Sequence, residues 1–211
     1  MIVPCAGYGT RMGSPPAKEL LINPETQAPL IEYCLKLADQ NQWNTVLITR
    51  HEKKILMDYV SQREAKKNLK TQWVLVHNTL EWPDSILKSY DFWSENNIMI
   101  LPDTTWSPRG IENDVLKDLD QCDVSFGVFE ATDKKTWGTV AISKENIQIC
   151  EKPQKQMPDY KAWGLIAFKK NIGKVLFSSI LESTQDHQVK TLQLKARTTH
   201  LNSFKDMTRI T

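Results

Sequence analysis

Short apolar runs alternate with helix-like patterns through the first half of the chain. Four runs predict buried strands: Ile2–Val3, Thr45–Thr49, Trp73–Val76 and Ile98–Leu101. Apolar spacings of three and four predict helices over Ile31–Gln40, over Lys53–Gln62 with Ile55, Leu56 and Tyr59 inward, and after an N-cap at Asp84 or Ser85. Strands that alternate with helices predict a mostly parallel sheet with helices on both faces, a Rossmann-like α/β fold.

Strands predominate in the second half. They are expected at Val124–Phe129, Thr139–Ile142, Ile147–Cys150 and Ala162–Phe168, before a last helix over Ile172–Leu181. The segment from Gln185 to Thr211 is polar and gives no clear pattern. We therefore expect a single domain over residues 1–211, with an α/β half at 1–122 and a β-rich half at 123–211.

Composition narrows the class of protein further. The 211 residues are 40% hydrophobic and 25% charged, as in soluble globular proteins. A net charge of +2 gives no reason to expect a nucleic-acid or membrane partner. The sequence has neither a secretory signal nor an apolar run of the roughly 20 residues that span a bilayer. Four scattered cysteines predict reduced thiols, and we expect a cytoplasmic protein.

The stretch after the first predicted strand has the composition of a phosphate-binding loop. Gly7 and Gly9 allow the backbone to approach a ligand, and Arg11 and Lys18 add positive charge. A P-loop would need glycine where Met12 stands. A dinucleotide fingerprint fails as well, because its third glycine comes one residue late and the second predicted strand ends at Thr49-Arg50-His51 without the acidic residue that would hold a ribose. The loop therefore indicates a polyphosphate ligand outside those two motifs.

Gly7-Tyr8-Gly9-Thr10-Arg11, followed by Lys18-Glu19-Leu20-Leu21, resembles the signature of the sugar-1-phosphate nucleotidyltransferases, which include glucose-1-phosphate thymidylyl- and uridylyltransferases. The resemblance implies a GT-A-like nucleotidyltransferase fold, in which residues 1–122 would form the nucleotide-binding half and residues 123–211 the sugar-phosphate-binding half. It also implies a Mg²⁺-dependent reaction between a nucleoside triphosphate and a sugar 1-phosphate, which gives a nucleotide sugar and pyrophosphate. Arg11 and Lys18 would be catalytic cations. Nucleotide contacts would come from Ala6, Gly7, Gly9, Thr10 and Arg11.

The same resemblance implies two metal ligands. Asp103 follows the predicted strand Ile98–Leu101, where open α/β sheets place their ligands, and it matches the family's catalytic aspartate. Mg²⁺ takes oxygen ligands and shares them with substrate phosphates. The family's second aspartate is best matched by Asp206, in a stretch that lacks the usual tryptophan. Without the resemblance, Asp103 could be a turn residue and Asp206 a surface residue.

An acceptor site is implied in the second half. Glu151-Lys152-Pro153 resembles an E-K-P element whose glutamate holds sugar hydroxyls, and Lys152 would reach the sugar phosphate. Gly138 and Gly164 resemble glycines that leave room for the sugar. The alternatives are an ordinary strand exit at Glu151 and core aromatics at the adjacent Trp137 and Trp163.

Base recognition is expected between His77 and Ser85, with Asn78 and Ser85 as the candidate contacts. An amide such as that of Asn78 offers both a donor and an acceptor. The family's glutamine and its glycine-containing turn are missing from this stretch, so the nucleotide is not identified.

Three other functions remain open from the sequence. A cytidylyltransferase for phosphocholine or another small phosphomonoester would share the same loop. A nucleotide-sugar-dependent glycosyltransferase would usually carry an acidic D-x-D motif, but Thr105 stands where the second acid would be. A nucleotide-binding regulatory protein that has lost catalysis is the third. Homo-oligomerisation is left open as well.

Overall fold

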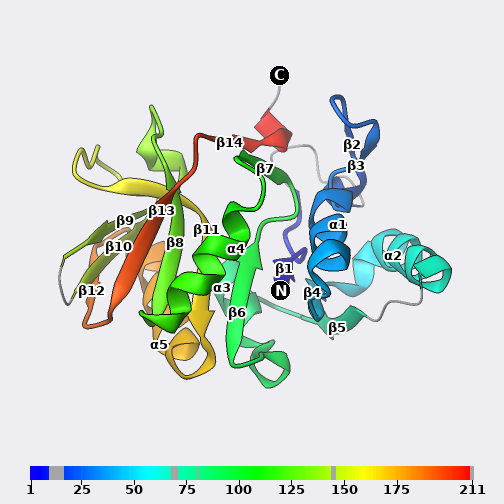
Figure 1. Cartoon of the computed structure of the whole chain (residues 1–211), viewed down its shortest axis with the longest axis horizontal. Coiled ribbons are helices and arrows are strands. Elements are labelled where there is room, and N and C mark those ends of the chain that lie inside the picture. Colours follow the sequence, from blue (N-terminus) through cyan, green and yellow to red (C-terminus); the bar gives the residue numbers. More distant parts are fainter. Residues whose placement is uncertain (10–16, 68–70, 80, 144–145, 210–211) are drawn as a thin grey trace. The chain divides into compact units, whose positions relative to one another are not determined.

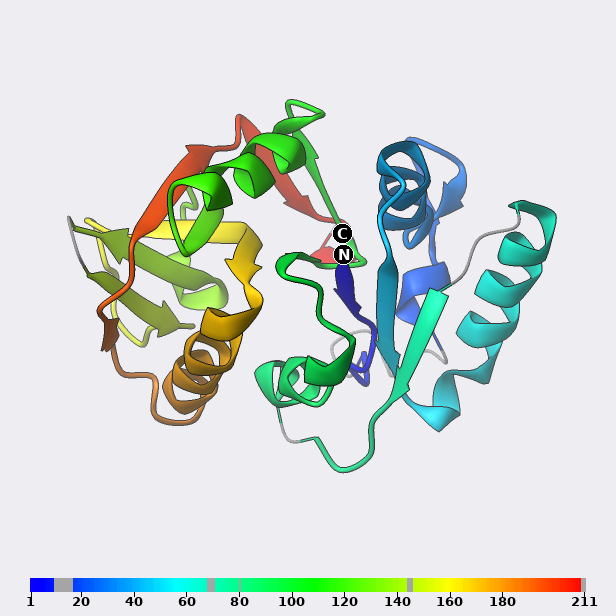
Figure 2. The same cartoon turned by 60° about the horizontal axis from the view of Figure 1, so that its bottom comes forward.

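The computed structural model describes residues 1–9, 17–67, 71–79, 81–143 and 146–209. The chain divides into two compact units, drawn in Figures 1 and 2. The first unit comprises Met1–Phe92, Ile100–Thr105 and the segment from Lys205 onward. The second comprises Trp93–Met99 and Trp106–Phe204. The predicted α/β class is confirmed.

Three parallel strands form the sheet of the first unit. β4 (Thr45–Thr49) lies between β1 (Ile2–Pro4) and β5 (Thr71–Leu75). All five residues of β4 are buried, as expected for a strand covered on both faces. Because the strands are parallel, the chain leaves all three at one edge of the sheet, where Ala6, Arg50 and Thr79 follow them.

Helices α1 (Glu32–Asn41) and α2 (Lys54–Lys67) follow β3 and β4 in the chain. α1 buries four apolar residues, namely Cys34, Leu35, Leu37 and Ala38. The two helices are joined by Arg63 of α2, which forms ion pairs with Glu32 and Asp39 of α1. α2 turns Leu56 and Val60 inward, but the prediction that Ile55 faces inward was wrong, since this residue is 56% exposed. Short elements complete the region: η2 (Lys18–Leu20), β2 (Ile22–Asn23), β3 (Ala28–Pro29) and η3 (His51–Lys53).

Helix α3 (Trp82–Leu87) begins earlier than predicted. Its N-cap is Glu81 rather than Asp84 or Ser85, and Pro83 lies in the first turn. Proline is favoured there because its fixed φ suits a helix and its missing N–H has no intrahelical partner to lose. The helix ends at Leu87, and η4 (Tyr90–Phe92) follows as a separate 3₁₀ turn.

The second unit is built mainly of antiparallel strands. β8 (Val124–Phe129) pairs with β11 (Lys161–Lys169), which also pairs with β9 (Gly138–Ile142). β9 pairs on its other side with β10 (Ile147–Glu151), and β10 in turn pairs with β12 (Lys190–Leu192). Helix α5 (Lys170–Asp186) follows β11, and its Phe177 packs edge-to-face on Phe168 and Trp93. The remaining elements are β6 (Asn96–Ile100), α4 (Ile111–Lys117), η5 (Asp118–Asp120) and η6 (Lys134–Thr136).

The polar C-terminal segment forms structure that its sequence did not predict. β13 (Ala196–His200) pairs in parallel with β8, which lies about 70 residues earlier. β14 (Ser203–Asp206) and η7 (Met207–Arg209) follow. β7 (Thr104–Ser107) was also missed. Such strands carry little hydrophobic signal because β13 and β14 bury few of their residues and owe their form to distant partners.

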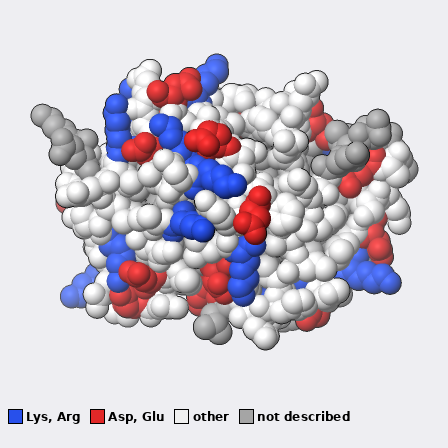
Figure 3. All heavy atoms as spheres, turned by 90° about the horizontal axis from the view of Figure 1, so that it is seen from below, with Lys and Arg blue, Asp and Glu red and all other residues white. Residues whose placement is uncertain are grey.

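Two surface properties bear on partners. Basic and acidic side chains are interspersed on the face drawn in Figure 3, as the small net charge suggests. Of the helices that the structure describes, none has the length and apolar character needed to cross a bilayer.

Candidate nucleotide-binding and metal site

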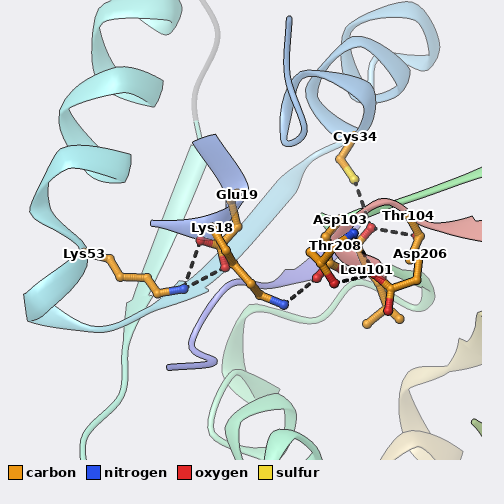
Figure 4. Close-up of polar contacts among 9 residues, drawn as sticks. All are labelled: Lys18, Glu19, Cys34, Lys53, Leu101, Asp103, Thr104, Asp206 and Thr208. Carbon is orange, nitrogen blue, oxygen red and sulfur yellow. Dashed lines mark hydrogen bonds and ion pairs between the residues drawn. The ribbon is translucent and has the colours of Figure 1, made fainter. Parts of the chain in front are cut away.

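The centre of the candidate site is an ion pair between Lys18 and Asp103. The Lys18 ammonium donates a hydrogen bond to Oδ2 of Asp103, as Figure 4 shows. Lys18 lies on η2 and Asp103 follows β6, so residues 85 positions apart in the sequence meet here. Asp103 is only 7% exposed. The structure therefore brings together two of the three predicted catalytic residues.

The environment of Lys18 favours its charged form. Burial lowers the pKa of its ammonium, but the Asp103 carboxylate, followed by Glu19 and Asp206, raises it, and the net shift is upward. A raised pKa keeps Lys18 protonated at neutral pH. Lys18 is thus a permanent cation among carboxylates, as a residue that binds phosphate needs to be.

Asp206 lies next to Asp103. The backbone N–H of Met207 donates to the carbonyl oxygen of Asp103 at 2.8 Å. Thr208 fixes the Asp206 carboxylate with two hydrogen bonds to Oδ1, from its N–H at 3.0 Å and its hydroxyl at 2.5 Å (Figure 4). Lys18 lies within electrostatic range of both aspartates. The two predicted metal ligands are thus brought to one place.

The carboxylates of Asp103 and Asp206 are oxygen ligands of the kind that Mg²⁺ takes from proteins. Among the described residues no group of three or more histidine, cysteine or acidic side chains could hold a metal. Mg²⁺ is commonly held by one or two carboxylates plus substrate phosphates, and the pair Asp103 and Asp206 meets that requirement. The Lys18 ammonium already provides Asp103 with a positive partner.

The residue after Lys18 in the chain, Glu19, forms a second ion pair, with Lys53. Glu19 is fully buried, and both of its carboxylate oxygens accept hydrogen bonds from the Lys53 ammonium at 2.7 and 2.9 Å (Figure 4). Lys53 is 4% exposed. This pair ties the turn that carries Lys18 to η3, which begins just after β4 and Arg50. Local sequence gives no sign of this pair, because its two members are 34 residues apart.

The loop after β1 is held by Arg50, a residue that was not predicted from the sequence as part of the site. Its Nε donates to the carbonyl oxygen of Ala6 at 2.5 Å, and its Nη2 donates to the carbonyl and hydroxyl oxygens of Thr79 at 3.1 and 2.6 Å. Arg50 is 5% exposed. It therefore connects the ends of all three parallel strands. A basic residue at the carboxyl end of the central strand was the available signal, since ligands bind at that edge.

The other predicted nucleotide contacts differ in their surroundings. Ala6 is buried, while Gly7 is exposed, and among the described residues no atom beyond its chain neighbours lies within 4 Å of where its Cβ would be. Asn78 is exposed and has a left-handed backbone with φ of 52°, whereas the Ser85 hydroxyl bonds to the Trp82 carbonyl inside α3 at 2.6 Å. Gly9 has φ of 67°. Thr10 and Arg11 lie outside the described residues.

The second unit contains the residues predicted for the acceptor. Glu151 of β10 stands opposite Gly138 of β9 and is 4% exposed. A Cβ on Gly138 would lie 2.3 Å from the Trp163 indole and 2.4 Å from Oε2 of Glu151. The absence of a side chain at Gly138 thus makes room for Glu151 and Trp163 themselves. Lys152 follows with a left-handed φ of 48°.

Gly164 is covered by an aromatic ring rather than left open. It lies at an irregularity in the pairing of β11 with β8, and a Cβ there would be 2.1 Å from the Phe204 ring. Phe204 stacks on Phe129 with ring centroids 4.6 Å apart, and it meets the Trp137 ring edge-on at 5.6 Å. The role predicted for Gly164 as a place for the sugar stays a prediction.

No protein-family model matches the sequence, and none of the curated proteins searched does. Solved structures match in fold. A Bacillus anthracis protein assigned as a glucose-1-phosphate thymidylyltransferase, crystallised in complex with sucrose, superposes with a TM-score of 0.74. The alignment covers 97% of this chain and 88% of the other, at 16% sequence identity. This chain has a nucleotidyltransferase-like fold. At that identity the likeness concerns the fold alone.

Proposed function

We propose that the protein is a nucleotidyltransferase that joins a nucleoside triphosphate to a sugar 1-phosphate and releases pyrophosphate. The observation that supports this most directly is the ion pair between Lys18 and Asp103. It places a buried carboxylate and a permanent cation together in the unit that also carries the glycine loop. The likeness in fold to a protein assigned to that activity supports the same reaction.

The proposed chemistry is an in-line displacement. An oxygen of the acceptor phosphate forms a bond to the α-phosphorus, and the bond from that phosphorus to the oxygen bridging to the β-phosphate breaks. Pyrophosphate leaves with the bonding electrons. The attacking phosphate is ionised at neutral pH, so no general base is needed. Catalysis then depends on positioning and charge neutralisation.

Lys18 would bind the α-phosphate and neutralise charge that develops there. The N–H groups around Gly7, together with Arg11, would bind the β- and γ-phosphates. Asp103 and Asp206 would hold Mg²⁺, which neutralises phosphate charge when bound. Glu151 would accept hydrogen bonds from acceptor hydroxyls, and Lys152 would bind the acceptor phosphate.

The test is a matrix of pyrophosphate-release assays with Mg²⁺, in which each nucleoside triphosphate is paired with several sugar 1-phosphates and with phosphocholine. We expect turnover with one pair, and a loss of about a hundredfold or more in Asp103→Asn and in Asp206→Asn. Asp58→Asn, at an exposed position of α2, is the matched control and should turn over like the wild type.

Two results would reject the assignment. Wild-type rates in Asp103→Asn would show that Asp103, the central residue of the proposed site, takes no part in the reaction. Silence across the matrix, with a triphosphate still raising the melting temperature, would identify a nucleotide-binding protein without catalysis.

A second candidate acceptor is phosphocholine or a similar small phosphomonoester. The aromatic cluster of Phe129, Trp137 and Phe204 favours it, because aromatic faces attract quaternary ammonium groups. Turnover with phosphocholine and not with sugar 1-phosphates would select this acceptor.

A further inference from the structure

Tyr8, in the glycine loop, has an unusual setting for a half-exposed tyrosine. The guanidinium carbon of Arg50 lies 4.1 Å from the centre of its ring, which is a cation–π contact. Tyr8 is nevertheless 56% exposed. Since Arg50 lies over one face of the ring, a flat ligand would have to approach the ring from the opposite face.

The support beneath the ring is rigid. Arg50 is buried and makes hydrogen bonds to Ala6, two residues before Tyr8, and to both oxygens of Thr79. Among the described residues Arg50 forms no ion pair, so its positive charge is not neutralised by a carboxylate and remains available to the Tyr8 ring. A ring held on a fixed guanidinium loses little freedom when a flat group stacks on it.

The same guanidinium sets the spacing between two loops. It bonds the loop that carries Tyr8 and the loop that carries Asn78, next to Thr79. Asn78 is exposed, and its left-handed backbone is a conformation that asparagine tolerates better than most residues. An aromatic face and an amide held at a fixed separation are the elements needed to stack a base and to bond its edge.

We propose that the face of Tyr8 opposite Arg50 is a stacking platform for the nucleobase of the triphosphate, positioned by Arg50. The proposal rests on the proposed nucleotide-binding function and adds the site of the base. Stacking accepts any base because every base has a π face, so selectivity among bases would fall to edge contacts such as that of Asn78.

Nucleotide and inorganic tripolyphosphate affinities, measured by calorimetry with Mg²⁺, separate this role from phosphate binding. Tyr8→Ala should weaken binding of the best nucleoside triphosphate about tenfold and leave tripolyphosphate, which has no base, within about twofold of wild type. Tyr8→Phe keeps the ring and should bind both ligands like the wild type. Phe92→Ala removes another exposed aromatic, 43% exposed, and is the matched control.

Several results would overturn the proposal. Equal weakening of both ligands in Tyr8→Ala would mean that the ring only shapes the phosphate loop, and no weakening of either would mean that the base lies elsewhere. The alternative stacking site is the pair His51 and His77, which follow β4 and β5. Both residues are exposed, and their stacked rings have centroids 5.2 Å apart. Selective nucleotide loss in His77→Ala but not in Tyr8→Ala would place the base there.

The outcome can be told apart from failure of the proposed function. A wild-type protein that binds no triphosphate would refute both statements. A wild type that binds triphosphate without turnover, and loses that binding selectively in Tyr8→Ala, would reject the reaction and keep the platform. Unchanged melting temperatures of the ligand-free variants would show that each still folds.

Discussion

The ammonium of Lys18 is hydrogen-bonded to the carboxylate of Asp103 across 85 residues of sequence. Each charge has the other as a partner. In the proposed function, a bound triphosphate would bring negative charge to Lys18, and a cation bound with it would bring positive charge to Asp103. Each residue would then exchange its partner for an oppositely charged ligand, so both charges would stay compensated.

Replacement of Lys18 should affect turnover strongly. We expect Lys18→Ala and Arg11→Ala each to lower turnover by about a hundredfold or more, because each removes a cation from the phosphates in the transition state. Steady-state rates of pyrophosphate release measure the effect. Lys54→Ala, at an exposed position of α2, should behave like the wild type. Near wild-type turnover in Lys18→Ala would exclude Lys18 from catalysis.

The buried pair of Glu19 and Lys53 should be costly to break. Lys53→Met leaves the fully buried Glu19 carboxylate without its cation, and we expect a loss of about 3–5 kcal/mol in the free energy of unfolding. The double variant Glu19→Leu with Lys53→Met should recover much of that loss, because no unpaired charge remains. Urea unfolding measures both.

The exposed pair of Lys205 and Glu25 is the control for that experiment. Their side chains are 56% and 59% exposed, so Lys205→Met should change stability by no more than about 1 kcal/mol. An equally small effect of Lys53→Met would show that the buried pair adds little to stability.

Gly164 should tolerate no side chain while Phe204 is in place. A Cβ there would overlap the Phe204 ring, so Gly164→Ala should lower the unfolding free energy by about 1–3 kcal/mol. Adding Phe204→Ala to that variant should cost less than Phe204→Ala costs in the wild type, because the overlap is gone. Gly7→Ala should leave stability unchanged, because no described atom beyond the chain neighbours lies within 4 Å of the added Cβ. Additive effects at Gly164 and Phe204 would contradict the contact.

Tyr59 should make stability depend on alkaline pH. Burial, followed by the hydrogen bond from its hydroxyl to Glu32 at 2.9 Å, raises the pKa of Tyr59 from 10.0 to about 12. The folded state therefore holds this proton more tightly, so the contribution is complete below pH 10 and is lost as pH rises through about 12. Between those values the wild type should lose stability more steeply than Tyr59→Phe in urea unfolding. Parallel pH profiles of the two proteins would contradict this prediction.

Elements with strong local patterns could be predicted from the sequence. β4 and β8 begin and end where their apolar runs do, and α1 differs from its predicted range by one residue at each end. The glycine loop, Lys18 and Asp103 could be picked out because their residue types and order are themselves the signal. Periodicity and motif spacing are properties of neighbouring residues, so they can be read without a partner.

The contacts between residues far apart in the sequence depend on the fold and could not be predicted. Met207 bonds to the carbonyl of Asp103 and so brings Asp206 beside it, although the segment from Gln185 onward gave no readable pattern. Arg50 and Lys53 both follow β4. Arg50 nevertheless bonds the loops of Ala6 and Thr79, whereas Lys53 neutralises Glu19. Such pairings depend on which strands become neighbours and on which charges are buried together. Those are properties of the folded chain, and local sequence does not contain them.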